Sequence, residues 1–189
     1  MNALRNPKVA GLVWLIARLW LGYEWLTAGY EKVFGEGSAA YVGSKAGSGV
    51  AGFLKGALAK STLNPTLPAA QAAHPTVQTW YAYLVRDVFL PNATLFSYLV
   101  AFGELLVGIA LIVGIFTHFA ALMGVLMNLS YLFAGTTSTN PQMLVVGLTI
   151  VLVGGVAVGY YGIDFFARPI ERKLAHRGRA RLTHAPQPA

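Results

Sequence analysis

Residues 95–116 read LFSYLVAFGELLVGIALIVGIF, and Glu104 is the one charged residue among them. A helix needs about 20 apolar residues to cross the hydrocarbon core of a bilayer, so this stretch predicts a transmembrane helix. Residues 118–134, HFAALMGVLMNLSYLFA, form a second apolar stretch, and Thr117 alone separates the two. So short a connection predicts a tight antiparallel helical hairpin.

Two further apolar stretches flank this hairpin in the sequence. The first, residues 9–28, reads VAGLVWLIARLWLGYEWLTA, and the last, residues 142–161, follows a polar turn. Residues 9–28 are too long for the apolar part of a signal peptide, and they contain Arg18 and Glu24. The whole chain is 56% hydrophobic and 11% charged, whereas a soluble domain carries about a quarter charged residues. We therefore expect an all-α fold, a four-helix transmembrane bundle.

The segment between the first two predicted spans, residues 29–94, is long and mixed in composition. Residues 50–58 predict a short apolar helix, and residues 77–90, VQTWYAYLVRDVFL, predict an amphipathic helix rich in aromatic residues. Aromatic side chains commonly anchor helices at the headgroup level of a membrane. We expect short interfacial helices here, within a membrane domain of residues 1–167. They would either cover the ends of the bundle or take part in function.

Basic residues predict the orientation in the membrane. Arg5 and Lys8 precede the first span, and the tail, residues 168–189, holds six basic residues against Glu171 alone. Lys and Arg concentrate on the cytoplasmic side, so we expect a multi-pass protein of the inner or plasma membrane with both termini in the cytoplasm. Residues 29–94 would then be extracytoplasmic. The net charge of +7 favours contact with the lipid bilayer over nucleic acid, because no nucleic-acid-binding motif accompanies it.

Ionisable residues inside the predicted spans are candidate functional residues, because an unpaired charge there costs at least about 2.5–3.5 kcal/mol. Counting the helical rise puts Arg18 about 12–14 Å, and Glu104 about 16–18 Å, from the cytoplasmic end. Asn128 lies at nearly the same depth, and Glu24 lies nearer the outer interface. We predict that Arg18 and Glu104 pair as the catalytic floor of a pocket that opens outward. Glu24 and Asn128 are predicted to contact a substrate there. The alternative is a structural ion pair that fixes helix register.

Aromatic residues are expected above this polar floor. They are Trp20, Tyr23, Trp25 and Tyr131. Such residues commonly form an interfacial belt. They also suit a slot for a quinone ring, which needs apolar contacts and a hydrogen-bond donor for each carbonyl. We predict that these four residues bind a quinone, and the belt remains the alternative.

Several classes of redox site are not expected. The chain contains no cysteine, which excludes disulfides, iron–sulfur ligation and a thiol relay. None of the four histidines lies in the interior of a predicted span, so haem held by two histidines is not expected. The sequence has no phosphate loop, dinucleotide fingerprint or zinc-ligand spacing. Quinone is therefore the one cofactor predicted, with no haem, flavin or metal site.

Two pairs of motifs resemble those of DoxX-like membrane proteins. Residues 17–22, ARLWLG, and 28–33, AGYEKV, resemble the family's opening, in which an arginine is followed by a glycine and then by Gly-x-x-Lys. Residues 103–111, GELLVGIAL, and 114–117, GIFT, are similar to its Glu-x-x-x-Gly-x-x-Leu and Gly-x-Phe-Thr patterns. On this resemblance the family's polar positions fall on Arg18, Lys32 and Glu104.

The resemblance implies a four-helix membrane protein in a quinone-linked redox setting. The family includes the DoxD membrane subunit of thiosulfate:quinone oxidoreductase. The first hypothesis is therefore a membrane subunit that passes electrons from thiosulfate or another small sulfur compound to quinone, with Lys32 attracting the anionic substrate. The second is a non-catalytic anchor or assembly partner for an extracytoplasmic protein. A solute carrier is least favoured, because no inverted repeat is visible. A partner subunit or a homo-oligomer is expected.

Overall fold

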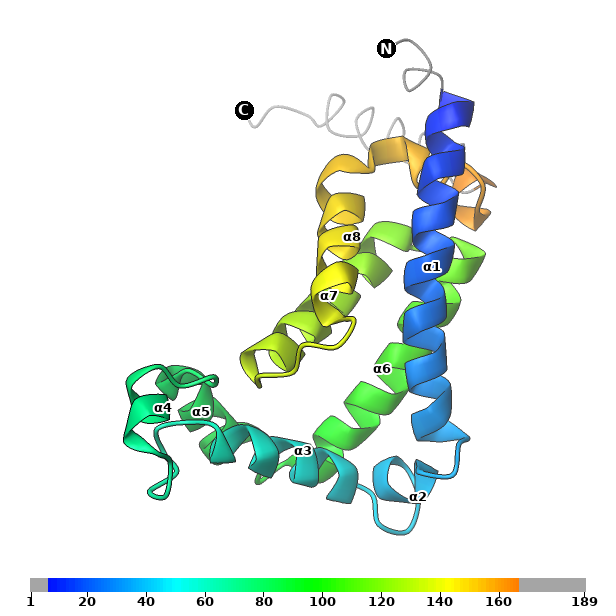
Figure 1. Cartoon of the computed structure of the whole chain (residues 1–189). Helices are drawn as coiled ribbons and strands as arrows, with labels where there is room; N and C mark the ends of the chain where they lie inside the picture. Colours follow the sequence, from blue (N-terminus) through cyan, green and yellow to red (C-terminus); the bar gives the residue numbers. More distant parts are fainter. Residues whose placement is uncertain (1–6, 167–189) are drawn as a thin grey trace, which may run out of the picture.

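The computed structural model describes residues 7–166, in which the regular elements are helices (Figure 1). The prediction of an all-α protein is confirmed. Two helices, α1 (Pro7–Val33) and α6 (Ala93–Val113), are long and apolar enough to cross a membrane. Two shorter apolar helices follow, α7 (Thr117–Phe133) and α8 (Asn140–Val153). The predicted basic tail, residues 168–189, lies outside the described residues.

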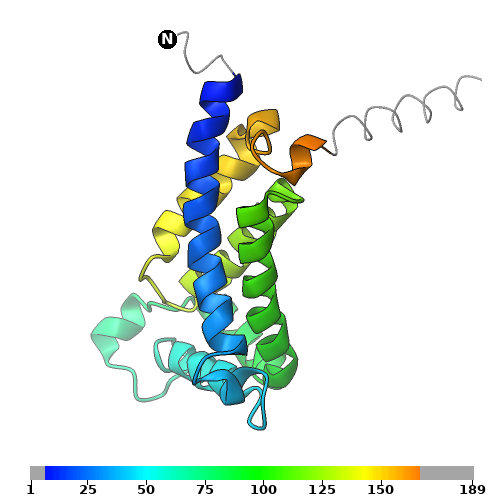
Figure 2. The same cartoon turned by 90° about the vertical axis from the view of Figure 1, so that its right-hand side faces the viewer.

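The four longer helices pack side by side, α1 on α6, α6 on α7 and α7 on α8, and α8 also contacts α1 (Figures 1 and 2). Helices α1 and α6 are antiparallel, with Gly29 against Leu105 and Gly108 against Leu26. A Cβ atom on either glycine would overlap the backbone of the opposite helix. These two glycines therefore allow α1 and α6 to approach each other closely, as small residues do in membrane helix pairs.

The first and last of these helices differ most from the predicted spans. Helix α1 continues to Val33, five residues beyond the predicted end at Ala28, because nothing in the sequence from Gly29 to Val33 stops a helix. Helix α8 ends at Val153, and the predicted helix to Tyr161 is wrong. The adjacent pair Gly154 and Gly155 breaks it, and Gly155 has a φ of 47°, in the left-handed region that favours glycine.

Residues 155–166 then turn back across the end of the bundle (Figure 2). They begin with a 3₁₀ turn, η3 (Gly155–Ala157), and reach the loop between α6 and α7. There the backbone N–H of Asp164 donates to the carbonyl of Gly114, with an N···O distance of 2.9 Å. We call the end of the bundle formed by residues 155–166 and the loop between α6 and α7 the far end of the molecule.

A layer of short helices, here called the cap, covers the opposite end (Figure 1). It contains α2 (Ser38–Tyr41), α3 (Ser48–Ala59), α4 (Ala69–Ala73), α5 (Thr79–Leu84) and the π-helical turn η2 (Val85–Phe89). Helix α3 and the continuous helical stretch of α5 and η2 occupy the two regions predicted to form short helices. The cap encloses its own apolar core, which includes Leu54, Val77 and Val85.

Among the hydrogen bonds that join the cap to the longer helices, one is made by a buried phenol. The Tyr81 hydroxyl donates to the backbone carbonyl of Ser130 in α7 at 2.8 Å. Burial raises the pKa of Tyr81, so its hydroxyl keeps the proton that makes this bond. The cap is therefore fixed against α7 on one side, and the contact of α3 with α6 fixes it on the other.

Candidate functional site

A buried carboxylate in α6 is held by one residue from each of the two long helices beside it, α1 and α7. Glu104 is 2% exposed. Its Oε2 atom lies 2.7 Å from Nζ of Lys32 in the last turn of α1. Its Oε1 atom accepts a hydrogen bond of 2.6 Å from the hydroxyl of Tyr131 in α7. We call these three residues the Glu104 cluster, which joins α1, α6 and α7 at the cap end.

The extra length of α1 is what brings Lys32 to this position. Residues Trp25, Gly29 and Lys32 follow one another at helical spacing, so they share the face that packs against α6. The Lys32 ammonium also donates to the carbonyl of Ala28, at 3.3 Å, which holds the side chain along the helix. It lies 5.6 Å from the centre of the Tyr41 ring in the cap.

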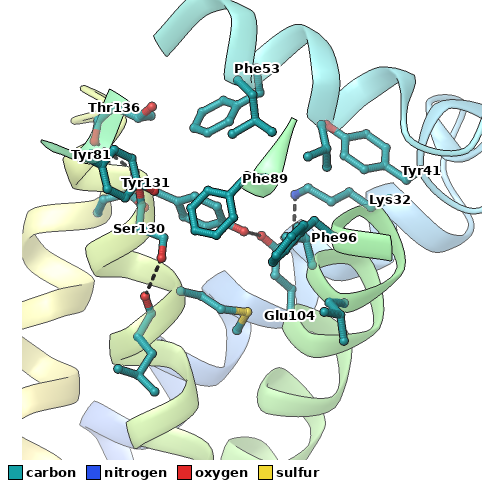
Figure 3. Close-up of a pocket in the computed structure, with 17 residues that line it drawn as sticks. Lys32, Tyr41, Phe53, Tyr81, Phe89, Phe96, Glu104, Ser130, Tyr131 and Thr136 are labelled. Atoms are coloured by element: carbon teal, nitrogen blue, oxygen red, sulfur yellow. Dashed lines mark hydrogen bonds and ion pairs between the residues drawn. The ribbon is translucent and has the colours of Figure 1, made fainter. Parts of the chain in front are cut away.

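The first of two cavities beside the Glu104 cluster is apolar and aromatic (Figure 3). Its volume is about 470 Å³, and it lies between the cap and the helices α6 and α7. The rings around it belong to Tyr41, Phe53, Tyr81, Phe89, Phe96 and Tyr131. Leu99 of α6 and Leu126 of α7 also line it, and they are 56% and 50% exposed. The apolar cavity therefore opens sideways between α6 and α7, through an apolar mouth.

The second cavity, of about 420 Å³, lies between α1 and the loop from α7 to α8. Its lining is more polar than that of the first cavity, so we call it the polar cavity; it includes Glu24, Thr27, Glu31, Ser138 and Thr139. All of these except half-buried Glu24 are exposed, so the polar cavity opens to the surface through hydrogen-bonding and acidic groups. The two cavities share five lining residues, the three of the Glu104 cluster together with Thr136 and Asn140. The Glu104 cluster is thus part of the wall between an apolar and a polar space.

The family model of DoxX matches residues 13–137. The chain belongs to the DoxX family. The match runs from the first turns of α1 to the loop after α7, so it includes the whole Glu104 cluster and the cap. The family resemblance in the motifs around Arg18 and Glu104 is therefore confirmed, and this DoxX chain is a membrane protein. No curated protein and no solved structure matches the chain.

The predicted ion pair between Arg18 and Glu104 is wrong in this DoxX protein. Because α1 and α6 pack antiparallel with Gly29 opposite Leu105, Glu104 lies level with the last turns of α1. Arg18 lies level with Gly114 instead, about 20 Å away along α1 at 1.5 Å per residue. The depth estimate failed because it placed the ends of the first two spans at the same level, whereas α1 extends well past the far end of α6.

Arg18 is buried and bonds to the returning segment at the far end. Its guanidinium donates to the carbonyl of Tyr161 at 2.9 Å and to that of Val158 at 3.4 Å. Gly114 and Gly162 lie against the guanidinium, where a Cβ atom on either would overlap it. Arg18 therefore fixes the far end and takes no part in the cavity site.

An acidic residue at the far end, Asp164, was not among the predicted site residues. Its carboxylate accepts hydrogen bonds from the backbone N–H groups of Phe116, at 2.8 Å, and Thr117, at 3.0 Å. These N–H groups begin α7, so Asp164 caps that helix from a distant point in the sequence. Both N–H groups can reach the Asp164 carboxylate because Phe116 has a φ of 48°, which turns the chain sharply into α7.

The other predicted site residues divide into two groups. Trp25 lines the polar cavity, with its ring centre 6.4 Å from that of Tyr131, and Glu24 lines the same cavity. Trp20 and Tyr23 are exposed on the outer face of α1, away from both cavities. Asn128 is buried in α7 and lines neither cavity, and its Oδ1 has no hydrogen-bond partner among the described residues.

Most of the aromatic residues that line the apolar cavity belong to the cap, and the sequence did not predict them as site residues. Phe53 from α3, Phe89 from η2 and Phe96 from α6 close the apolar cavity around the Glu104 cluster (Figure 3). The aromatic richness of residues 77–90 was the available signal for Tyr81 and Phe89. Within residues 7–166, no three His, Asp or Glu side chains are placed to hold a metal ion.

Proposed function

We propose that this DoxX protein is the membrane subunit of a quinone-linked oxidoreductase and binds the quinone ring in the apolar cavity. The observation that carries the proposal is the Glu104 cluster, which presents polar hydrogens at the wall of an otherwise aromatic cavity. A ligand that is flat and apolar and carries a hydrogen-bond acceptor at its edge fits such a space.

The chemistry of the cavity matches a quinone in three respects. Its volume of about 470 Å³ falls within the range of small-molecule pockets. An ammonium has three N–H donors, so Lys32 can hold Glu104 and the Ala28 carbonyl and still donate to a quinone carbonyl. The mouth at Leu99 and Leu126 gives an isoprenoid tail a route into the surrounding lipid.

The proposal includes four membrane crossings, by α1, α6, α7 and α8, with both termini in the cytoplasm and the cap outside. Lys and Arg near the termini support this orientation. With 17 and 14 residues, α7 and α8 are about 25 Å and 21 Å long, shorter than a typical hydrocarbon core of about 30 Å. The turns of residues 155–166 would complete the last crossing.

The charges around the Glu104 cluster indicate which kind of molecule could donate electrons to the quinone. Lys32 is already neutralised by Glu104, and the polar cavity adds the carboxylates of Glu24 and Glu31. A small anion such as thiosulfate would meet net negative charge there. This charge favours a partner subunit, or an uncharged sulfur compound, as the donor of electrons to the quinone.

A non-catalytic membrane anchor is the second candidate, and the surface of the cap favours it. Trp80 and Tyr83 of α5 are both exposed, and the Arg86 guanidinium lies 4.8 Å from the centre of the Tyr83 ring. Exposed aromatic and arginine side chains are typical of protein interfaces. An anchor of this kind requires no ligand in the apolar cavity.

A fluorescence titration with a short-chain quinone tests the proposal. Trp25 lies near Tyr131, so bound quinone should quench its emission saturably. Lys32→Met should weaken binding about tenfold, because it removes a charged hydrogen-bond donor. Trp20→Phe, on the outer face of α1, should leave the quenching unchanged, whereas Trp25→Phe should remove most of it. Quenching that does not saturate in the wild-type protein would favour the anchor.

A further inference from the structure

The two cavities offer a route for protons that the apolar cavity cannot provide by itself. Reduction of a quinone consumes two electrons and two protons and yields a quinol. The lining of the apolar cavity contains five titratable residues, Lys32, Tyr41, Tyr81, Glu104 and Tyr131. Three of these, the Glu104 cluster, also line the polar cavity, and the other two do not. A proton that enters from the polar side therefore reaches the apolar side through the Glu104 cluster.

The polar cavity is suited to hold water and exchange protons with it. Its mouth carries hydroxyl groups and the exposed carboxylate of Glu31, and half-buried Glu24 lies further along the same face of α1. The apolar cavity opens instead between leucines, at a mouth from which water is excluded when lipid covers it. Water thus has access to one face of the Glu104 cluster, and an apolar ligand to the other.

We infer that the Glu104 cluster is a proton gate between the polar cavity and a quinone in the apolar cavity; this rests on the proposed function. The Glu104 carboxylate first takes a proton from the water of the polar cavity, which exchanges protons with bulk solvent. Tyr131 then gives its hydroxyl proton to the quinone oxygen and takes the new proton of Glu104 along their 2.6 Å hydrogen bond, so that Glu104 returns to the carboxylate. Two such transfers accompany the two electrons that the proposed donor, a partner subunit or an uncharged sulfur compound, gives to the quinone.

Glu104 has charged or titratable neighbours on both sides. Lys32 pairs with its Oε2 atom, and the Tyr131 hydroxyl donates to its Oε1 atom. Glu24 and Glu31 are the other titratable groups that line the polar cavity. Tyr41 from α2 and Tyr81 from α5 are the titratable groups on the apolar side. The described lining of the cavities by α3 and α8 adds no titratable group.

A hydroxynaphthoquinone that changes colour on ionisation tests the gate without any redox reaction. The probe is bound to the purified full-length protein in lipid nanodiscs, and its colour is followed after a rapid change of pH. We expect the bound probe to change its protonation faster than it dissociates. Glu104→Gln should slow this change about tenfold or more, because the relay loses its carboxyl group.

A second experiment tests the gate by closing the polar cavity with a chemical label. The chain has no cysteine, so Thr139→Cys can be labelled with a bulky thiol reagent after the protein has folded. The label should slow proton exchange several-fold and leave the affinity for the probe nearly unchanged. Ser44→Cys, exposed in the cap and outside both cavities, is the matched control and should have no effect when labelled.

The outcomes separate the gate from the proposed function. Equal exchange rates in the wild-type protein, Glu104→Gln and labelled Thr139→Cys, with the probe still bound, would overturn the gate and leave quinone binding intact. Failure of the probe to bind the wild-type protein would overturn both. Slower exchange in both altered proteins, with binding retained, supports the gate.

Discussion

Glu104 illustrates how a buried charge is tolerated in an apolar setting. An isolated carboxylate in such a place is strongly destabilising, and it remains there only with partners that satisfy its oxygens. Here each oxygen has its own partner, Lys32 for one and Tyr131 for the other. The arrangement also leaves the three residues interdependent, because the loss of one partner exposes an unsatisfied group in the others.

This interdependence predicts a non-additive mutant cycle. Lys32→Met and Glu104→Gln should each lower the free energy of unfolding by about 2–3 kcal/mol, and the double variant should lose less than the sum. Thermal unfolding in detergent measures the three variants. The matched control pairs Arg18→Met with Glu104→Gln, whose effects should add, since those residues do not touch. Additive effects for Lys32 and Glu104 would contradict the ion pair.

At the scale of helices, the contact between α1 and α6 depends on two positions without side chains. A Cβ atom on Gly108 would overlap the backbone of Leu26, and backbone cannot move aside as a flexible side chain can. Glycine has no such role at position 56 of α3, where a Cβ atom would meet open space. The same substitution should therefore have opposite effects at the two positions.

We expect Gly108→Ala to lower the free energy of unfolding by about 3 kcal/mol, because α1 must shift away from α6. Gly56→Ala should raise it by about 0.5–1 kcal/mol, because alanine is the better helix former. Unfolding curves in detergent would show both. Gly108→Ala should also weaken quinone binding, since the shift separates Lys32 from Glu104. A Gly108→Ala protein as stable as the wild type would argue against close packing at this point.

The start of α7 yields a second prediction about a single helix. Asp164→Ala removes the acceptor for two N–H groups of α7 and should cost about 1–2 kcal/mol of stability. Asp87→Ala is the control, because Asp87 is exposed and its partner is the neighbouring Arg86. Thermal unfolding should therefore separate the two alanine variants. If both unfold at the wild-type temperature, Asp164 does not stabilise α7.

The sequence predicted where the helices lie along the chain better than it predicted which residues of neighbouring helices lie at the same level. Long apolar runs predicted α6 and α7 to within a few residues, because burial in lipid leaves a strong compositional signal. The end of α1 was harder, because residues 29–33 can be either helix or loop by composition. The site was affected by this error and by the assumption that α1 and α6 end at the same level: Lys32 lies in the added helical residues, and the true register puts it, instead of Arg18, at Glu104. The cap residues of the cavity depend on tertiary packing, which no local pattern specifies.

For the whole molecule, the proposed orientation puts the cap and the far end on opposite sides of the membrane. Single cysteines at Ser44, exposed in the cap, and His118, exposed at the far end, would test it in the cysteine-free chain. A membrane-impermeant thiol reagent should label Ser44→Cys on intact cells and His118→Cys only after permeabilisation. Labelling of both in intact cells would overturn the orientation with the cap outside.

The contacts of Arg18 also have a consequence for biosynthesis. Helix α1 leaves the ribosome before the other described helices, yet the carbonyls that accept from the Arg18 guanidinium belong to Val158 and Tyr161, about 140 residues later. During most of translation, Arg18 therefore lacks these two acceptors, and a nascent chain interrupted after α8 would still lack them. An unsatisfied arginine in an apolar helix then distinguishes an incomplete chain from a finished one, and chaperones or proteases of the membrane can act on that difference.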